Sequence, residues 1–177
     1  VIFDLDKHTP DREVNNSKTH YPFRFDGVLP MTTSQTDVLD VVAKPVIEDV
    51  LNGVNGTIFA YGQTGSGKTF TITGGPSRYE DRGLIPRTIA SMFETFRKSD
   101  VTYRMYVSYL EIYQDAGYDL LRDDTAKNLE ELPKVQLRED EDGNMHLRNL
   151  SVNVAATEED ALNLLFLGDT TRQVAET

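Results

Sequence analysis

The sequence has 177 residues, 38% of them hydrophobic, which fits a single domain with a buried core. It contains no cysteine, so a disulfide framework and a thiolate metal site are both excluded. No apolar run approaches the roughly 20 residues of a membrane helix. The chain opens on acidic residues, without the basic start of a signal peptide. We therefore expect an intracellular domain without a membrane segment.

The chain is acidic, with a net charge of −11, and nearly all of the excess lies after residue 99. Such a surface disfavours nucleic acid and anionic lipid as partners. A solvated acidic face that aids solubility is the simplest explanation of the excess. The first residue is Val1 and no initiator methionine precedes it, so we expect the sequence to be an internal piece of a longer protein.

Three short segments in the first half of the chain have the pattern of β-strands. Residues 1–5 are mostly apolar, and residues 21–26 alternate apolar and polar side chains, as a half-buried strand does. Residues 57–61 form an apolar run that is typical of a buried strand. This third strand is expected to lead directly into a glycine-rich loop.

A helix is expected between the second and third of these strands, over residues 34–51. Thr33 or Ser34 would be its N-cap, and Pro45 should kink it or mark a break. Asn52-Gly53 should end it, since Gly and Asn commonly follow a last helical turn.

Two further helices are expected around an exposed loop. The first begins within the glycine-rich loop at Gly67-Lys68 and ends where the loop over residues 74–82 begins. The second opens at residues 85–88, with Pro86 in its first turn. Its apolar face is expected to consist of Ile89, Met92, Phe93 and Phe96.

The remainder of the chain predicts a long strand, a hairpin and a last helix. Residues 103–113 are rich in aromatic and β-branched side chains, which favours a central strand. Residues 134–138 and 145–154 should form a hairpin around Asp142-Gly143. The last helix begins after Thr157 with a capping box. Its buried side is expected to consist of Ala161, Leu164, Leu165 and Leu167. Strands alternating with helices indicate an α/β class.

The glycine-rich loop matches a phosphate-binding motif, G-x-x-x-x-G-K-[S/T], at every fixed position. The matching residues are Gly62, Gln63, Thr64, Gly65, Ser66, Gly67, Lys68 and Thr69. Glycines allow a tight turn with several N–H groups pointing inward at phosphate oxygens. Lys68 would place a positive charge between the β- and γ-phosphates, and Thr69 would offer its hydroxyl to Mg²⁺. An ordinary polar loop with a chance lysine is the alternative.

Other polar clusters are better explained by structure than by chemistry. The segment Asp140–Gly143 fits D-x-x-G, a metal-side motif of P-loop enzymes, but no buried apolar strand precedes it, so we interpret it as a solvated turn. The acidic pairs Glu130-Glu131 and Glu158-Glu159 are explained by surface charge and helix capping. No chemistry is assigned to the three scattered histidines, His8, His20 and His146.

Several collinear segments of the chain resemble the kinesin motor head. They are Phe23–Asp26, Phe59–Thr69, Gly83–Arg87, Tyr109–Tyr113 with Tyr118–Leu121, and Ala161–Arg172. Within the kinesins, Phe70–Gly75 and Leu162–Thr170 are most similar to the ninth family, which is associated with cilia and flagella.

The resemblance implies a P-loop nucleotide-binding fold with a central, mainly parallel or mixed sheet flanked by helices. It implies ATP or ADP with Mg²⁺ as ligands, held by Gly62–Thr69, with Thr69 on the metal. Phe70 occupies the place where many kinesins have a histidine against the adenine ring, and its aromatic face can still stack there.

The same resemblance implies that residues 1–177 are a partial motor domain. The sequence contains neither the Arg-x-Arg-Pro strand of the adenine pocket nor either of the two switch motifs. The main tubulin-contacting helices of the family would also lie elsewhere. No catalytic residue is therefore expected within this segment, and the segment alone is not expected to hydrolyse ATP at a motor's rate.

For the parent protein, the resemblance implies a microtubule-stimulated ATPase in the cytoplasm and cytoskeleton, in the axoneme of a cilium or flagellum. Microtubules would be its partner, and a coiled coil outside this chain would make it a dimer. The hairpin over residues 134–148 is in the region of a tubulin contact, but its mixed charges predict weak attraction. A structural axonemal subunit with little ATP turnover and an unrelated P-loop GTPase or transport ATPase are the alternatives.

Overall fold

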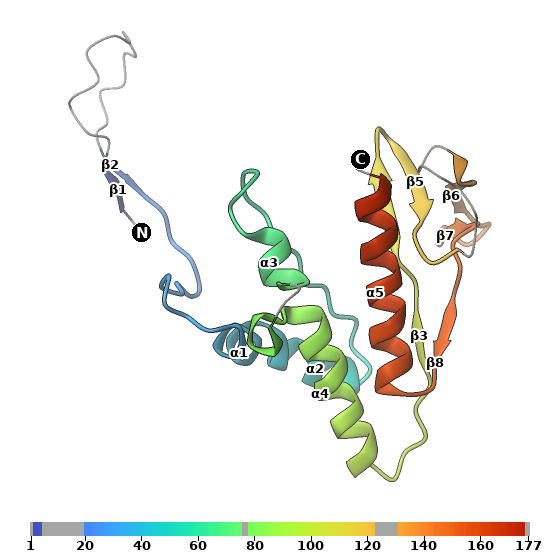
Figure 1. Cartoon of the computed structure of the whole chain (residues 1–177), viewed down its shortest axis with the longest axis horizontal. Helices are drawn as coiled ribbons and strands as arrows, with labels where there is room; N and C mark the ends of the chain where they lie inside the picture. Colours follow the sequence, from blue (N-terminus) through green and yellow to red (C-terminus); the bar gives the residue numbers. More distant parts are fainter. Residues whose placement is uncertain (1, 5–19, 76–77, 123–130, 176–177) are drawn as a thin grey trace, which may run out of the picture.

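The structure, a computed structural model, describes residues 2–4, 20–75, 78–122 and 131–175. It combines helices with three small sheets, which confirms the α/β class (Figure 1). Strand β1 (Ile2–Asp4) pairs with β2 (His20–Pro22), and β3 (Met105–Val107) pairs with β8 (Asn153–Ala155). The third sheet is a meander of β4 (Leu110–Tyr113), β5 (Ala116–Asp119), β6 (Lys134–Glu139) and β7 (Met145–Arg148).

The helix predicted over residues 34–51 forms as three continuous segments. These are α1 (Gln35–Val38), the π-helical η1 (Leu39–Ala43) and α2 (Lys44–Leu51). Ser34 is the N-cap and forms a reciprocal capping box with Asp37. Pro45 lies in the first turn of α2 directly after the π turn, and the backbone stays helical there, so the expected kink or break is a change from π-helix to α-helix and not an interruption. Asn52 caps the end, and Gly53 follows with a φ of 87°.

The glycine-rich loop leads into a short helix, which is followed by an excursion of the chain between Gly74 and Arg82. Helix α3 covers Lys68–Ile72, the 3-10 turn η2 covers Tyr79–Asp81, and α4 covers Leu84–Lys98. An isolated β-bridge between Gly74 and Arg82 closes the base of this excursion. A Cβ on Gly74 would lie 2.3 Å from the carbonyl oxygen of Asp81, so the close approach requires glycine.

One hydrophobic core lies where α4 and the last helix, α5 (Glu158–Ala175), pack against the β3–β8 sheet (Figure 1). Its buried members are Ile89, Phe93, Ala155, Ala161 and Leu165. Thr157 and Asp160 exchange hydrogen bonds at the start of α5, as the predicted capping box requires. Leu167, however, is 46% exposed and does not belong to the buried side of α5 that the sequence predicted.

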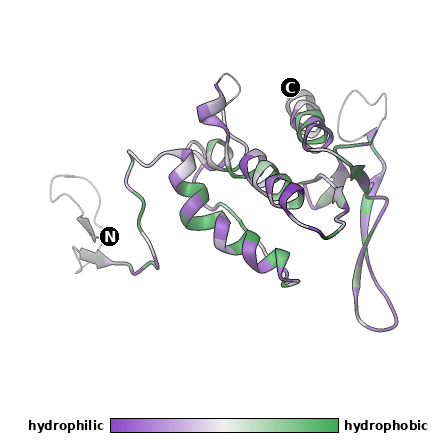
Figure 2. Ribbon diagram, turned by 90° about the horizontal axis from the view of Figure 1, so that it is seen from below, coloured by the Kyte–Doolittle hydropathy of each residue, from purple (hydrophilic) through white to green (hydrophobic). Residues whose placement is uncertain are grey.

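A second core lies between η1, α2 and α4. Its buried members are Leu39, Ala43, Ile47 and Leu84. Gly56 passes so close to α2 that an added Cβ would lie 2.5 Å from Cγ1 of Val46. Figure 2 shows hydrophobic and hydrophilic residues on different sides of the helices, as expected for elements that bury one face.

The sheets differ from the sequence-based expectation in their connectivity. Every strand pairing in the described part of the chain is antiparallel, so a mainly parallel central sheet is not present there. Residues 57–61 form no strand, and Phe59 and Tyr61 are 83% and 94% exposed. No other segment of the described residues pairs with this run, and a strand requires a neighbour that completes its backbone hydrogen bonds.

Three other predicted strands were wrong in extent. The strand over 21–26 ends at Pro22. The long strand over 103–113 is divided into β3 and β4, because the chain leaves the β8 ladder near Ser108 and enters the meander. The second arm of the hairpin, over 145–154, divides in the same way into β7 and β8.

Candidate nucleotide-binding site

The glycine-rich loop adopts the tight turn that its sequence predicts. Gly65 and Gly67 have φ values of 81° and 91°, in the left-handed region that favours glycine. Gly67 is the N-cap of α3, so the loop ends where the helix begins. Ser66 N donates to the carbonyl oxygen of Gln63 at 3.2 Å and closes a turn within the loop.

Lys68 is the first residue of α3 and reaches back over the loop. Its Nζ donates to the carbonyl oxygens of Gly62 at 2.9 Å and Gln63 at 2.8 Å. These two carbonyls hold the ammonium group at the mouth of the loop. Thr69 follows in the first turn of α3 and is exposed to solvent.

Phe70 lies one position further along α3, with its side chain 48% exposed. Its ring lies beside Gly75, where an added Cβ would be 3.5 Å from Cε2 of Phe70. An aromatic ring of this exposure is able to stack on a base.

The donor set of the loop fits a phosphate chain with a bound divalent cation. The N–H groups in the first turn of a helix have no helical acceptor and are available to anions. A Cβ added at Gly62 would lie 2.6 Å from Oγ of Ser66, so a larger residue there would require the Ser66 hydroxyl to turn away. In the described part of the chain no group of three His, Asp or Glu residues is placed to hold a metal. A cation here would therefore be held by Thr69 and by phosphate oxygens.

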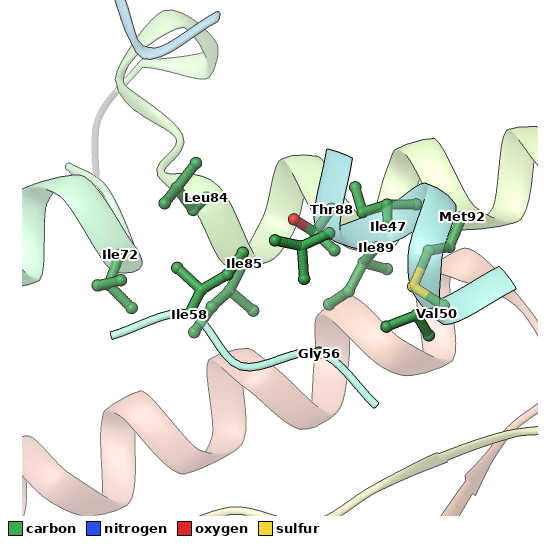
Figure 3. A pocket seen from close by; sticks show the side chains of 11 residues that line it. Ile47, Val50, Gly56, Ile58, Ile72, Leu84, Ile85, Thr88, Ile89 and Met92 are labelled. Atoms are coloured by element: carbon green, nitrogen blue, oxygen red, sulfur yellow. The ribbon is translucent and has the colours of Figure 1, made fainter. Parts of the chain in front are cut away.

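Two cavities lie near the loop, and the first of them is almost entirely apolar. The first, about 300 Å³, lies between α2, α4 and residues 56–58, and Thr88 is its single polar side chain (Figure 3). The second, about 290 Å³, is lined in part by Ser66, Gly67, Lys68 and Thr71. Its apolar lining includes Leu29, Val38, Val42, Phe59, Tyr61 and Ile72.

The structure thus brings the predicted residues, Gly62 to Phe70, together in one loop and one helical turn. Two side chains that the sequence analysis did not single out also contact this region. Gln35 donates to the carbonyl oxygen of Phe70 at 2.7 Å, and Arg87 contacts the excursion that follows α3. Neither residue belongs to a motif with a predicted function, so only the fold reveals them.

The segment Asp140–Gly143 is a hairpin turn, as the sequence predicted. Oδ1 of Asp140 accepts hydrogen bonds from the backbone N–H groups of Asp142 at 3.0 Å and Asn144 at 2.8 Å. His146 contacts the other oxygen at 2.7 Å, which is the largest cause of the lowered pKa of Asp140. Glu158 forms an exposed ion pair with Arg97. His8, Glu130 and the side chain of His20 lie outside the described residues.

An α/β chain with a glycine-rich loop that opens a helix carrying Lys and Thr has the architecture of the P-loop nucleotide-binding class. The family model of the kinesin motor domain matches residues 3–177. The chain therefore belongs to the kinesin motor domain family.

Relatives and a solved structure agree with this family. The chain is 43% identical to kinesin-like protein KLP1 of Chlamydomonas reinhardtii over 92% of its length, and 40% identical to KIF9 of Mus musculus over 97%. It covers 20% and 21% of those two proteins. The structure of a fast kinesin is similar, with a TM-score of 0.79 and 33% identity, over 88% of this chain and 43% of that one.

No helix in the ranges that the structure describes has the length and apolar character needed to cross a membrane.

Proposed function

We propose that this chain is the ATP-binding part of a kinesin-like microtubule motor, in which residues 1–177 form part of the motor domain. The observation that supports this most directly is the loop from Gly62 to Thr69, whose turn places Lys68 at the mouth and Thr69 in the first helical turn. The kinesin motor domain family, to which the chain belongs, consists of microtubule-stimulated ATPases.

In this proposal each part of the loop has a defined task. Backbone N–H groups around Gly65 and Gly67 bind the phosphate oxygens. Lys68 exchanges its two carbonyl partners for the β- and γ-phosphates, which carry full negative charge and bind an ammonium group more strongly. Thr69 holds Mg²⁺, which neutralises phosphate charge when bound. Phe70 stacks on the adenine ring.

Turnover by the parent protein needs groups that these 177 residues do not contain. Hydrolysis of ATP requires an oriented water and a sensor of the γ-phosphate. The loop supplies binding and orientation of the phosphate chain, and we assign catalysis to the parent protein and no catalytic residue to this segment.

The hairpin of β6 and β7 supports a microtubule contact in the parent protein. Residues directly opposite in an antiparallel pair lie on the same face. The register pairs Gln136 with Arg148 and Arg138 with His146, so these side chains share one face. Leu137, Leu147, Glu139 and Met145 share the other face.

The sequence predicted weak attraction between this hairpin and microtubules because acidic and basic residues are mixed along it, but the two faces of the hairpin carry different residues. The two arginines lie together on one face and Glu139 lies on the opposite face, while Asp140 of the turn contacts His146 of the arginine face at 2.7 Å. A face with clustered positive charge attracts an acidic surface such as that of a microtubule. We propose that this face, defined by Gln136, Arg138, His146 and Arg148, meets tubulin.

We place the parent protein in the cytoskeleton of a cilium or flagellum, and we expect it to dimerise through a coiled coil elsewhere in its sequence. Similarity to KIF9 supports the ninth kinesin family. A second candidate function, a structural axonemal subunit with little turnover, is favoured by the acidic charge of the chain.

Binding of a fluorescent ATP analogue in the presence of Mg²⁺ tests the nucleotide site. The Lys68→Ala variant of the full-length protein should lose at least about tenfold in affinity, because a charge-assisted contact to phosphate contributes about 1.5–3 kcal/mol. Lys98→Ala, which removes an exposed lysine paired with Glu94, is the matched control and should bind as wild type does. Equal binding by wild type and Lys68→Ala would refute the assigned site.

A further inference from the structure

The end of helix α3 leaves a backbone carbonyl that the helix itself does not satisfy. In a continuing helix the N–H of Gly74 would bond to the carbonyl oxygen of Phe70. Here Gly74, with a φ of 103°, turns the chain away, and its N–H bonds to the carbonyl oxygen of Thr69 at 3.1 Å. The carbonyl of Phe70 therefore needs a donor from another element, since an unpaired polar group costs free energy when sheltered from water.

That donor is the side-chain amide of Gln35, in the first turn of α1. Its Nε2 donates to the Phe70 carbonyl oxygen at 2.7 Å and makes a longer contact, 3.5 Å, with the carbonyl oxygen of Asp81. Gln35 is only 8% exposed, so water does not compete for this bond as it would at the surface.

Arg87 of α4 fixes the excursion beside Gln35. Its guanidinium donates to the carbonyl oxygens of Arg82 at 2.7 Å and Glu80 at 2.9 Å. The same group donates to Oγ1 of Thr36, the neighbour of Gln35, at 3.1 Å. The excursion and the start of α1 are thereby held together around the end of α3.

The ring of Phe70 is backed by the base of this excursion. A Cβ added at Gly75 would lie 3.5 Å from Cε2 of Phe70 and 3.1 Å from Cβ of Asp81. Gly75 therefore lies between the Phe70 ring and the side chain of Asp81. The backbone of Phe70 is anchored by Gln35, its ring lies beside Gly75, and almost half of its surface stays exposed.

We propose that Gln35 is a positioning residue of the nucleotide site, which holds the Phe70 carbonyl and so sets the direction in which the Phe70 ring meets the base. The inference rests on the proposed nucleotide function. Gln35 itself touches no part of the nucleotide. The Gln35 amide donates to the carbonyl oxygens of Phe70 and Asp81, neither of which belongs to the loop from Gly62 to Thr69, so loss of the Gln35 bond leaves the phosphate contacts in place.

The test compares two probes, Mg²⁺·ATP and Mg²⁺·tripolyphosphate, which share the phosphate chain but not the base. In the full-length protein, Gln35→Met keeps the length of the side chain and removes the donor. We expect a loss of about tenfold in ATP affinity, equivalent to about 1.4 kcal/mol, with tripolyphosphate affinity unchanged. The KM for ATP should rise by a similar factor, while kcat at saturating ATP stays the same, because the lost contact is made equally in the ground state and the transition state.

A double-mutant cycle separates positioning from general support of the fold. In a Phe70→Ala background no ring remains to position, so adding Gln35→Met should cause no further loss of ATP affinity. Asn163→Met, at an exposed position of α5, is the control and should bind both probes as wild type does. Equal losses for ATP and tripolyphosphate, or the same loss in both backgrounds, would overturn the assignment. Unchanged ATP affinity in Gln35→Met would overturn it too.

A second variant keeps the test decisive if Gln35→Met folds poorly. Gln35→Glu places a carboxylate against the Phe70 carbonyl oxygen and replaces attraction with repulsion, so its ATP affinity should fall further than that of Gln35→Met, again without a matching loss for tripolyphosphate. ATP binding as tight as in wild type would refute the role of Gln35. A wild-type protein that binds neither probe would instead refute the nucleotide function itself.

Discussion

Replacing Gly168 by alanine is expected to destabilise the fold, because α5 packs against an aromatic ring at this position. A Cβ on Gly168 would lie 2.0 Å from Cδ1 and 2.5 Å from Cε1 of Tyr109. Ordinary carbon contacts are about 3.5 Å or longer, so the ring would have to move by about 1.5 Å. That movement would also break the hydrogen bond that the Tyr109 hydroxyl donates to Oδ1 of Asp169 at 2.7 Å.

The magnitude follows from three contributions. Overpacking of a core costs about 1–3 kcal/mol. Loss of a hydrogen bond to a charged group costs about 1.5–3 kcal/mol. The higher helix propensity of alanine relative to glycine stabilises the helix by about 1 kcal/mol and offsets part of these costs. We therefore expect the free energy of unfolding to fall by about 1.5–5 kcal/mol.

Urea unfolding of the purified wild-type protein and the Gly168→Ala variant measures this difference. Asn163→Ala, at an exposed position of the same helix, is the control for helix propensity and should unfold within about 0.5 kcal/mol of wild type. If Gly168→Ala unfolded at the same urea concentration as wild type or a higher one, the packing of Tyr109 against α5 would be refuted.

Three further predictions concern a buried phenol, a helix cap and a charged face. Burial, together with the hydrogen bond to Asp169, raises the pKa of Tyr109 from 10.0 to about 12. The native state then keeps a proton that the unfolded state releases, so this contribution to stability is complete below pH 10 and is lost as the pH rises towards about 12. Tyr109→Phe should reduce that loss in urea unfolding curves, and an unchanged pH dependence would contradict the assignment. Ser34→Ala removes the capping box of α1 and should cost about 1 kcal/mol in thermal unfolding, and an unshifted melting temperature would contradict the cap. Arg148→Glu should weaken co-sedimentation of the parent protein with microtubules, most clearly at low salt, whereas Glu141→Gln in the hairpin turn should not. Equal sedimentation of wild type and Arg148→Glu would exclude this face from the contact.

Local features of the fold could be predicted from the sequence because their causes lie within a few residues. The Ser34 cap and the turn at Gly143 each depend on neighbouring residues, and both form. The glycine-rich loop is of this kind too, since its glycines and its lysine occupy fixed positions within eight residues.

Features that depend on distant partners could not be predicted in the same way. The apolar and β-branched residues of a run such as 57–61 predict a strand, but they do not indicate which segment would pair with it. The division of residues 103–113 between two sheets is decided by β8, which pairs with β3 from far along the chain. The contact of Gln35 with the Phe70 carbonyl could not be predicted from the sequence either, because this carbonyl becomes available only when Gly74 ends α3.

The central proposal is that this chain binds ATP for a motor, and phosphate release by the full-length protein tests it most directly. Turnover should be measured with and without microtubules, for wild type and for Lys68→Ala. We expect turnover by wild type that microtubules increase, and loss of that turnover in Lys68→Ala with the fold intact. Wild-type protein that sediments with microtubules yet shows no turnover above the level of Lys68→Ala would contradict the motor and favour the structural subunit.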